Sequence, residues 1–148
     1  MMLFSESIGR KVVSTSTADT VGAVGEFLVD PRSRTVAGVQ IKKCKTGDAL
    51  TWSGISSFGS DAVTVESVDT IVEIDTEDSL SGLHGKAHRV IGKRALSTAG
   101  VDLGTVDDVE FDPETGAVTS VIVDTVSIDG HTLTGVGSYA VVLDHRDR

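Results

Sequence analysis

His84 and His88 are the first candidates for chemistry, because they are four residues apart. On a helix, this spacing places two imidazoles on one face, as in helical zinc sites. Gly85 lies between the two histidines and Gly82 precedes them, and glycine disfavours a helix interior. No carboxylate motif accompanies the pair. We therefore expect two solvated loop histidines, and no metal or other cofactor.

A run of six acidic residues is the second candidate. A calcium loop needs a ladder of carboxylates around a central glycine, followed by a terminal glutamate. In this run, apolar residues alternate with the acids, as in a half-buried strand, and the side chains of a strand point alternately to opposite faces. We therefore expect a solvated strand face and no calcium site. The six residues are Asp102, Asp107, Asp108, Glu110, Asp112 and Glu114.

Two further patterns do not fit an enzyme. A phosphate-binding loop needs four residues between its glycines and Ser or Thr after its lysine. Here six residues separate Gly85 from Gly92, and Arg94 follows Lys93. Cys44 lies between two lysines, which favour a thiolate, but the sequence supplies no base or orienting partner. The chain is therefore not expected to be an enzyme.

The composition excludes further classes of protein and of binding partner. The chain has 148 residues, of which 39% are hydrophobic and 24% charged, with a net charge of −9, and this is a foldable globular composition. No apolar run is long enough for a membrane span. A single cysteine excludes an internal disulfide, so we expect a cytoplasmic protein. The basic residues are scattered, so direct binding to nucleic acid or to anionic lipid is not expected.

The elements that would position these residues occur twice. Val21–Lys43 matches Leu103–Thr125 at a shift of 82, with six identities. Upstream, residues 9–15 match 92–98 at a shift of 83, and downstream, residues 59–63 match 137–141 at a shift of 78. The order of the three blocks is kept, which indicates an internal repeat whose second copy has a loop four residues shorter. The identical pairs are Gly22/Gly104, Val24/Val106, Asp30/Asp112, Pro31/Pro113, Val36/Val118 and Val39/Val121.

Each copy has the pattern of a β-hairpin. An Asp-Pro pair separates two runs rich in β-branched residues, as expected for a turn between strands. Gly116 ends the second turn in a position that favours a positive φ, and Arg34 aligns with it. We therefore predict a positive φ for Arg34. Short closing strands are predicted at Ala62–Val65 and Ala140–Leu143, and single helical turns at Ser53–Ser57 and Asp75–Leu80.

The repeat predicts two small antiparallel β-barrels. They comprise residues 1–67 and 83–148, and residues 68–82 form an acidic linker. The first part is neutral, the linker contributes −5 and the second part −4. Barrels of this size are marginally stable alone, so we expect one two-lobed body. Phe27 and Phe111 are expected to be core anchors.

At these residues the chain resembles the PRC-barrel family. The resemblance rests on Ile91–Gly100 and Leu103–Gly116, and on Ile8–Val13, Val21–Pro31 and Trp52–Val65 in the first copy. It implies an all-β fold of two SH3-like, partly open barrels, and a role in assembly, not catalysis. Known members form the cytoplasmic part of the photosynthetic reaction-centre H subunit and the C-terminal domain of the ribosome maturation factor. This chain differs from both, because we expect no membrane anchor and no separate N-terminal domain.

The resulting hypothesis is a non-enzymatic adaptor for a protein partner. Acidic charge steers basic partners, so the candidate contact surface consists of Glu73, Asp75, Glu77, Asp78, Asp107, Asp108 and Glu110. Two alternatives remain: a small-ligand-binding domain with a pocket between the two barrels, and a ribosome-associated factor that binds a basic ribosomal protein. Homo-oligomerisation is left open.

Overall fold

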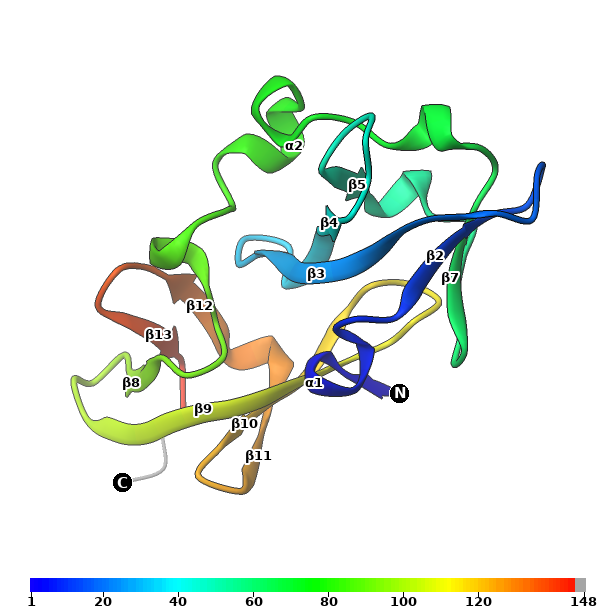
Figure 1. The fold of residues 1–148 in the computed structure, drawn as a ribbon. Coiled ribbons are helices and arrows are strands. Elements are labelled where there is room, and N and C mark those ends of the chain that lie inside the picture. Colours follow the sequence, from blue (N-terminus) through cyan, green and yellow to red (C-terminus); the bar gives the residue numbers. More distant parts are fainter. Residues whose placement is uncertain (146–148) are drawn as a thin grey trace.

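The computed structural model describes residues 1–145 as two curled β-sheets connected by short helical turns (Figure 1). The first sheet contains β2 (Lys11–Ser14), β3 (Thr20–Asp30), β4 (Thr35–Lys42), β5 (Ala49–Thr51), β6 (Ser57–Phe58) and β7 (Ala62–Val65). The second contains β8 (Arg94–Ser97), β9 (Asp102–Phe111), β10 (Val118–Val123), β11 (Val126–Asp129), β12 (Leu133–Val136) and β13 (Ala140–Leu143), and β1 (Met2–Leu3) pairs with β9. The helical elements are α1 (Phe4–Ser7), α2 (Asp78–Ser81), η1 (Trp52–Gly54), η2 (Val68–Thr70), η3 (Ile74–Thr76), η4 (Lys86–His88) and η5 (Gly130–Thr132). The predicted all-β, two-lobed body is confirmed.

The two sheets have the same strand order. It is β5-β4-β3-β2-β7-β6 in the first and β11-β10-β9-β8-β13-β12 in the second. The sequence predicted antiparallel barrels, but each sheet contains one parallel pair, β2 with β7 and β8 with β13. Parallel strands need a long crossover connection. Here most of each sheet's chain lies between the two paired strands, so the parallel pairing is accessible.

The register of the strands follows the repeat in the sequence. Corresponding cross-strand pairs occur at the predicted shifts of 82, 83 and 78, and the two closing strands have the predicted bounds. The pairs Val24–Ile41 and Val106–Val123 are equivalent, as are Lys11–Ala62 and Arg94–Ala140.

The four-residue difference between the copies lies in one connection. Six residues (43–48) separate β4 from β5, whereas only Asp124 and Thr125 separate β10 from β11. Both of these have positive φ, 47° and 72°, as a two-residue hairpin turn of type I′ requires. Neither is glycine, and the Asp107 carboxylate accepts a hydrogen bond from the Thr125 N–H (2.8 Å). Asp107 therefore supports a strained turn.

One aromatic cluster joins the two sheets. The rings of Phe4 and Phe27 stack with centroids 4.0 Å apart, and Phe27 lies 5.2 Å from Phe111 of the second sheet. Phe58 also lies 5.2 Å from Phe111. All four phenylalanines are buried, and the main core is continuous across both sheets. Phe27 and Phe111 are therefore core anchors, and the expected fused body is confirmed.

The segment of residues 68–82, the acidic segment, packs against the first sheet. Ile74 and Leu80 are buried there with Leu28 and Ala49. Val72 and Ala49 exchange two backbone hydrogen bonds of 2.9 Å. In Figure 1 the segment carries α2 along the side of β4 and β5. It is a folded cover for the outer face of this sheet, with helical turns close to the predicted Asp75–Leu80.

The described helices are all short. None of the helices within residues 1–145 is long and apolar enough to cross a membrane.

Candidate functional site at the junction of the sheets

The two long hairpins meet at their tips. The Val36 N–H donates to the Gly116 carbonyl (2.7 Å), and the Val118 N–H donates to the Arg34 carbonyl (2.9 Å). Each turn is closed in the same way, by a 2.8 Å hydrogen bond from its fifth residue to the carbonyl of its aspartate. The φ angles of Arg34 and Gly116 are 58° and 80°. The predicted positive φ of Arg34 is confirmed.

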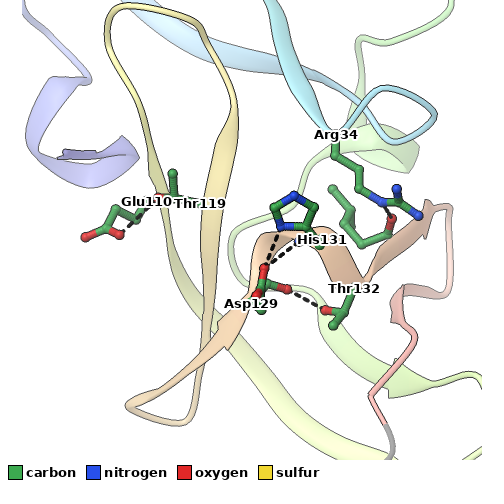
Figure 2. A network of polar contacts seen from close by, with 7 residues as sticks. Arg34, Glu110, Thr119, Asp129, His131 and Thr132 are labelled. Atoms are coloured by element: carbon green, nitrogen blue, oxygen red, sulfur yellow. Dashed lines mark hydrogen bonds and ion pairs between the residues drawn. The ribbon is translucent and has the colours of Figure 1, made fainter.

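The two tips differ in the size of the residue at the positive φ and in the contact that this residue makes with the other half of the molecule. A Cβ on Gly116 would lie 2.9 Å from the Trp52 ring, so glycine makes room for the indole. Arg34 has a long side chain, and its Nε donates to the Leu133 carbonyl of the second sheet (2.7 Å; Figure 2). At the shift of 78, Trp52 corresponds to Gly130. Trp52 therefore lies against a glycine of the opposite hairpin, whereas the position equivalent to Trp52 is itself a glycine, packed against the Val118 backbone.

The segments that lead into β2 and β8 cross to the opposite sheet. In the first, β1 pairs with β9, and Ser5 bonds through its N–H and its hydroxyl to the Asp108 carboxylate. In the second, Arg89 forms an ion pair of 2.6 Å with Glu26 on β3. Glu26 and Asp108 correspond at the shift of 82. The two halves thus exchange equivalent contacts.

A pocket of about 310 Å³ lies between these two lead-in segments and β3. Its apolar lining comes from both halves: Phe4, Ile8 and Phe27 from the first, and Val90 and Ile91 from the second. Ile8 is 45% exposed. The remaining lining residues are Gly25, Glu26, Lys42 and Arg89.

The pocket has a positive rim. The Glu26 carboxylate is paired with Arg89. In contrast, no described residue forms a hydrogen bond or ion pair with the Lys42 ammonium. The stem of Lys42 runs past Gly25, where a Cβ would lie 3.2 Å from the lysine Cγ. At the shift of 82, Asp107 and Asp124 replace Gly25 and Lys42. Among the described residues, the first sheet therefore combines this space with an unpaired cation, and the second sheet has two aspartates at the corresponding positions.

The candidate acidic residues fall into two groups. Those of the acidic segment lie on the cover of the first sheet, and Glu73, Asp75 and Asp78 are exposed. Figure 1 shows α2 and β9 on opposite sides of the molecule, so the structure does not bring Glu73–Asp78 together with the candidates on β9.

The residues of the second group form hydrogen bonds with other parts of the chain. Asp107 holds the Thr125 turn, and Asp108 holds Ser5. The Glu110 carboxylate accepts a hydrogen bond of 3.0 Å from the Thr119 hydroxyl (Figure 2). Asp107 and Glu110 therefore have hydrogen-bond partners in the second sheet and its turn, whereas the partner of Asp108 lies in α1.

Two of the histidines contact carboxylates. The His84 Nε2 lies 3.6 Å from the Asp75 carboxylate. The His131 Nδ1 lies 2.9 Å from the Asp129 carboxylate, which also accepts a hydrogen bond from the His131 N–H and caps the start of η5 (Figure 2). This backbone hydrogen bond, helped by the His131 ring, lowers the pKa of Asp129. Within residues 1–145, no three metal-ligating side chains gather.

Cys44 is half-buried in the loop after β4. Desolvation raises the pKa of its thiol, but hydrogen bonds involving Thr46 and Gly47 outweigh it, so the net pKa is lowered. Within residues 1–145, the side-chain partner of this thiol is the Thr46 hydroxyl, which is not a general base.

The sequence indicated a pocket between the barrels only as part of an alternative to the adaptor function, and it did not identify the lining residues. Ile8 and Ile91 precede the matched glycines Gly9 and Gly92, so the repeat marked the two segments. The crossing of each segment to the opposite sheet has no signal in the local pattern, because it depends on tertiary packing.

Comparison with known proteins gives a match over the second sheet and the segment that leads into it. No curated protein matches the chain. Residues 85–144, from the second lead-in segment to the end of β13, match the family model of the PRC-barrel domain.

Proposed function

We propose that this protein is a non-enzymatic interaction and assembly adaptor of the cytoplasm. The observation that carries the proposal is the PRC-barrel match over residues 85–144, since this domain is a small β-barrel interaction module. We further propose that the first sheet is a second copy of the domain. The shared strand order, the equivalent registers and the matching hairpin turns support this reading.

The proposed partner is a basic protein, and its proposed contact is the acidic segment. Ile74 and Leu80 anchor this segment on the first sheet, so its carboxylates lie on an ordered part of the fold. Pre-organised groups lose less entropy on binding than groups on a mobile tether. The segment contains five acids and no basic residue, and this charge steers a basic partner electrostatically.

Replacing four carboxylates of the acidic segment tests this contact. A variant with Glu73→Gln, Asp75→Asn, Glu77→Gln and Asp78→Asn keeps the buried anchors of the segment. A control variant with Asp19→Asn, Asp61→Asn and Glu66→Gln removes three exposed acids from loops beside the strands of the first sheet. The immobilised proteins are incubated with lysate at low and at high salt, and the captured proteins are quantified by mass spectrometry.

The expected result is a set of basic proteins captured by the parent and the control but lost with the four-fold variant. High salt should also weaken capture, because charges are screened over about 10 Å at 0.1 M salt. Ribosomal proteins within this set would favour the ribosome-associated alternative. Capture unchanged by both the variant and salt would contradict the acidic contact.

A second candidate function is small-ligand binding. The pocket of about 310 Å³ between the lead-in segments favours it, because small-molecule sites begin at roughly this size and combine an apolar lining with a few polar groups. A rise of the melting temperature with a purified small molecule would support it.

A further inference from the structure

The pocket between the two lead-in segments combines two features that select a ligand. Its lining is mostly apolar: Phe4, Phe27 and Val90 are buried, and Ile8 and Ile91 are more exposed. Its charged lining comprises two cations and one carboxylate, and that carboxylate is already paired with Arg89. The Lys42 ammonium remains for a ligand.

We propose that this pocket binds a small monocarboxylate with an apolar body, such as a medium-chain fatty acid. The apolar body would replace water against the phenylalanine and isoleucine side chains, and the carboxylate would pair with Lys42 at the rim. This inference rests on the second candidate function and names its ligand class.

The corresponding place on the second sheet is an internal comparison. There, Asp107 and Asp124 stand where the pocket has Gly25 and Lys42. The Asp107 and Asp124 carboxylates accept the N–H groups of Thr125 and Thr105. An anionic ligand would be repelled by these charges, so the proposed preference belongs to the first sheet alone.

The charge of the whole protein makes the local cation decisive. With a net charge of −9, the long-range field repels an anion, and the attraction must come from groups within about a Debye length of the site. A neutral ligand of the same shape would gain the apolar contacts and lose the contact with Lys42. Comparing the two ligands therefore separates the charge from the shape.

The test uses octanoate and its neutral analogue 1-octanol with the full chain. Binding is followed by amide chemical shifts in NMR spectra at neutral pH. We expect octanoate to shift the amides of Gly25, Glu26, Val90 and Ile91, with a dissociation constant of about 1 mM, the affinity typical of such a small ligand. Octanol should bind about fivefold more weakly.

Two pairs of variants locate the site. Lys42→Gln should weaken octanoate binding about fivefold and abolish the preference over octanol, whereas Lys45→Gln, an exposed lysine outside the pocket, should change neither. Ile8→Gln should weaken both ligands. Its control is Val101→Gln, because Val101 is 44% exposed, like Ile8, and lies outside the pocket lining.

The outcomes distinguish the ligand class from the ligand function. Equal binding of octanol and octanoate in the pocket would overturn the monocarboxylate and leave small-ligand binding intact. Absence of shifts with both ligands, or shifts confined to residues outside the pocket, would overturn both. Neither result would affect the capture of a basic protein by the acidic segment.

Discussion

The outer faces of the two sheets differ although the strands beneath them correspond. On the first sheet, Leu28, Ala37 and Ala49 form an apolar face covered by Ile74 and Leu80. At the corresponding positions, the second sheet has Glu110, Thr119 and Ser127, and Glu110 and Thr119 bond to each other. The outer face of the first sheet is therefore apolar and needs a cover, whereas the outer face of the second sheet is formed by polar side chains. The acidic segment consequently has a structural task in addition to its charge.

The inner faces show the opposite relation, because both sheets contribute to one core. Phe111 is fully buried and lies against Phe4, Phe27 and Phe58. The two sheets are therefore similar in strand order, different on their outer faces and dependent on each other in the core.

The largest expected effect concerns the shared core. Phe111→Ala should lower the free energy of unfolding by about 3–5 kcal/mol, because it removes a buried ring from the centre of the cluster. Urea unfolding, followed by Trp52 fluorescence and by far-ultraviolet circular dichroism, should show one coincident transition shifted as a whole. Two separate transitions would mean that the copies fold independently.

An exchange of residues between the outer faces should be strongly asymmetric. Leu28→Glu places a carboxylate under the cover of the first sheet and should cost about 3 kcal/mol or more. The reciprocal change, Glu110→Leu, loses one side-chain hydrogen bond at a half-buried site and should cost about 1 kcal/mol or less. Equal costs, measured by chemical denaturation, would remove the distinction between covered and open faces.

The hairpin tips should also respond differently. Gly116→Ala combines a positive φ with a clash against Trp52, so we expect a loss of about 2 kcal/mol. Arg34→Gly relieves the backbone but removes the hydrogen bond to Leu133, and its net effect should stay within about 1 kcal/mol. From the positive φ alone, a neutral or stabilising result would be expected for this second change. Thermal denaturation of both variants compares the tips directly.

The smallest expected effect concerns the short turn of the second sheet. Thr125 is β-branched and has a φ of 72°, a conformation that glycine adopts without strain. Thr125→Gly should therefore raise the free energy of unfolding by about 0.5–1 kcal/mol. Lys45→Gly in the longer equivalent loop serves as the control and should give no gain. A destabilised Thr125→Gly variant would show that the turn is not strained.

Much of the local structure could be predicted, because the repeat compares the chain with itself. Gly116 indicated the conformation of Arg34, and the change of shift from 82 to 78 indicated a shorter loop, which lies between β10 and β11. The candidate surface could be predicted less well. Asp107, Asp108 and Glu110 are acidic in the pattern, but their hydrogen bonds inside the fold depend on Thr125, Ser5 and Thr119.

The sequence by itself determined the strands, the turns and the correspondence of the two copies, because these depend on alternation and on turn residues close together in the chain. Tertiary structure alone decided which sheet each lead-in segment contacts, and with it the pocket of Phe4, Ile8 and Val90. It also decided that the acidic segment is a cover. The physical reason is that apolar side chains such as Ile74 and Leu80 are buried wherever the folded surface offers a matching apolar face, and strand periodicity does not specify which face that is.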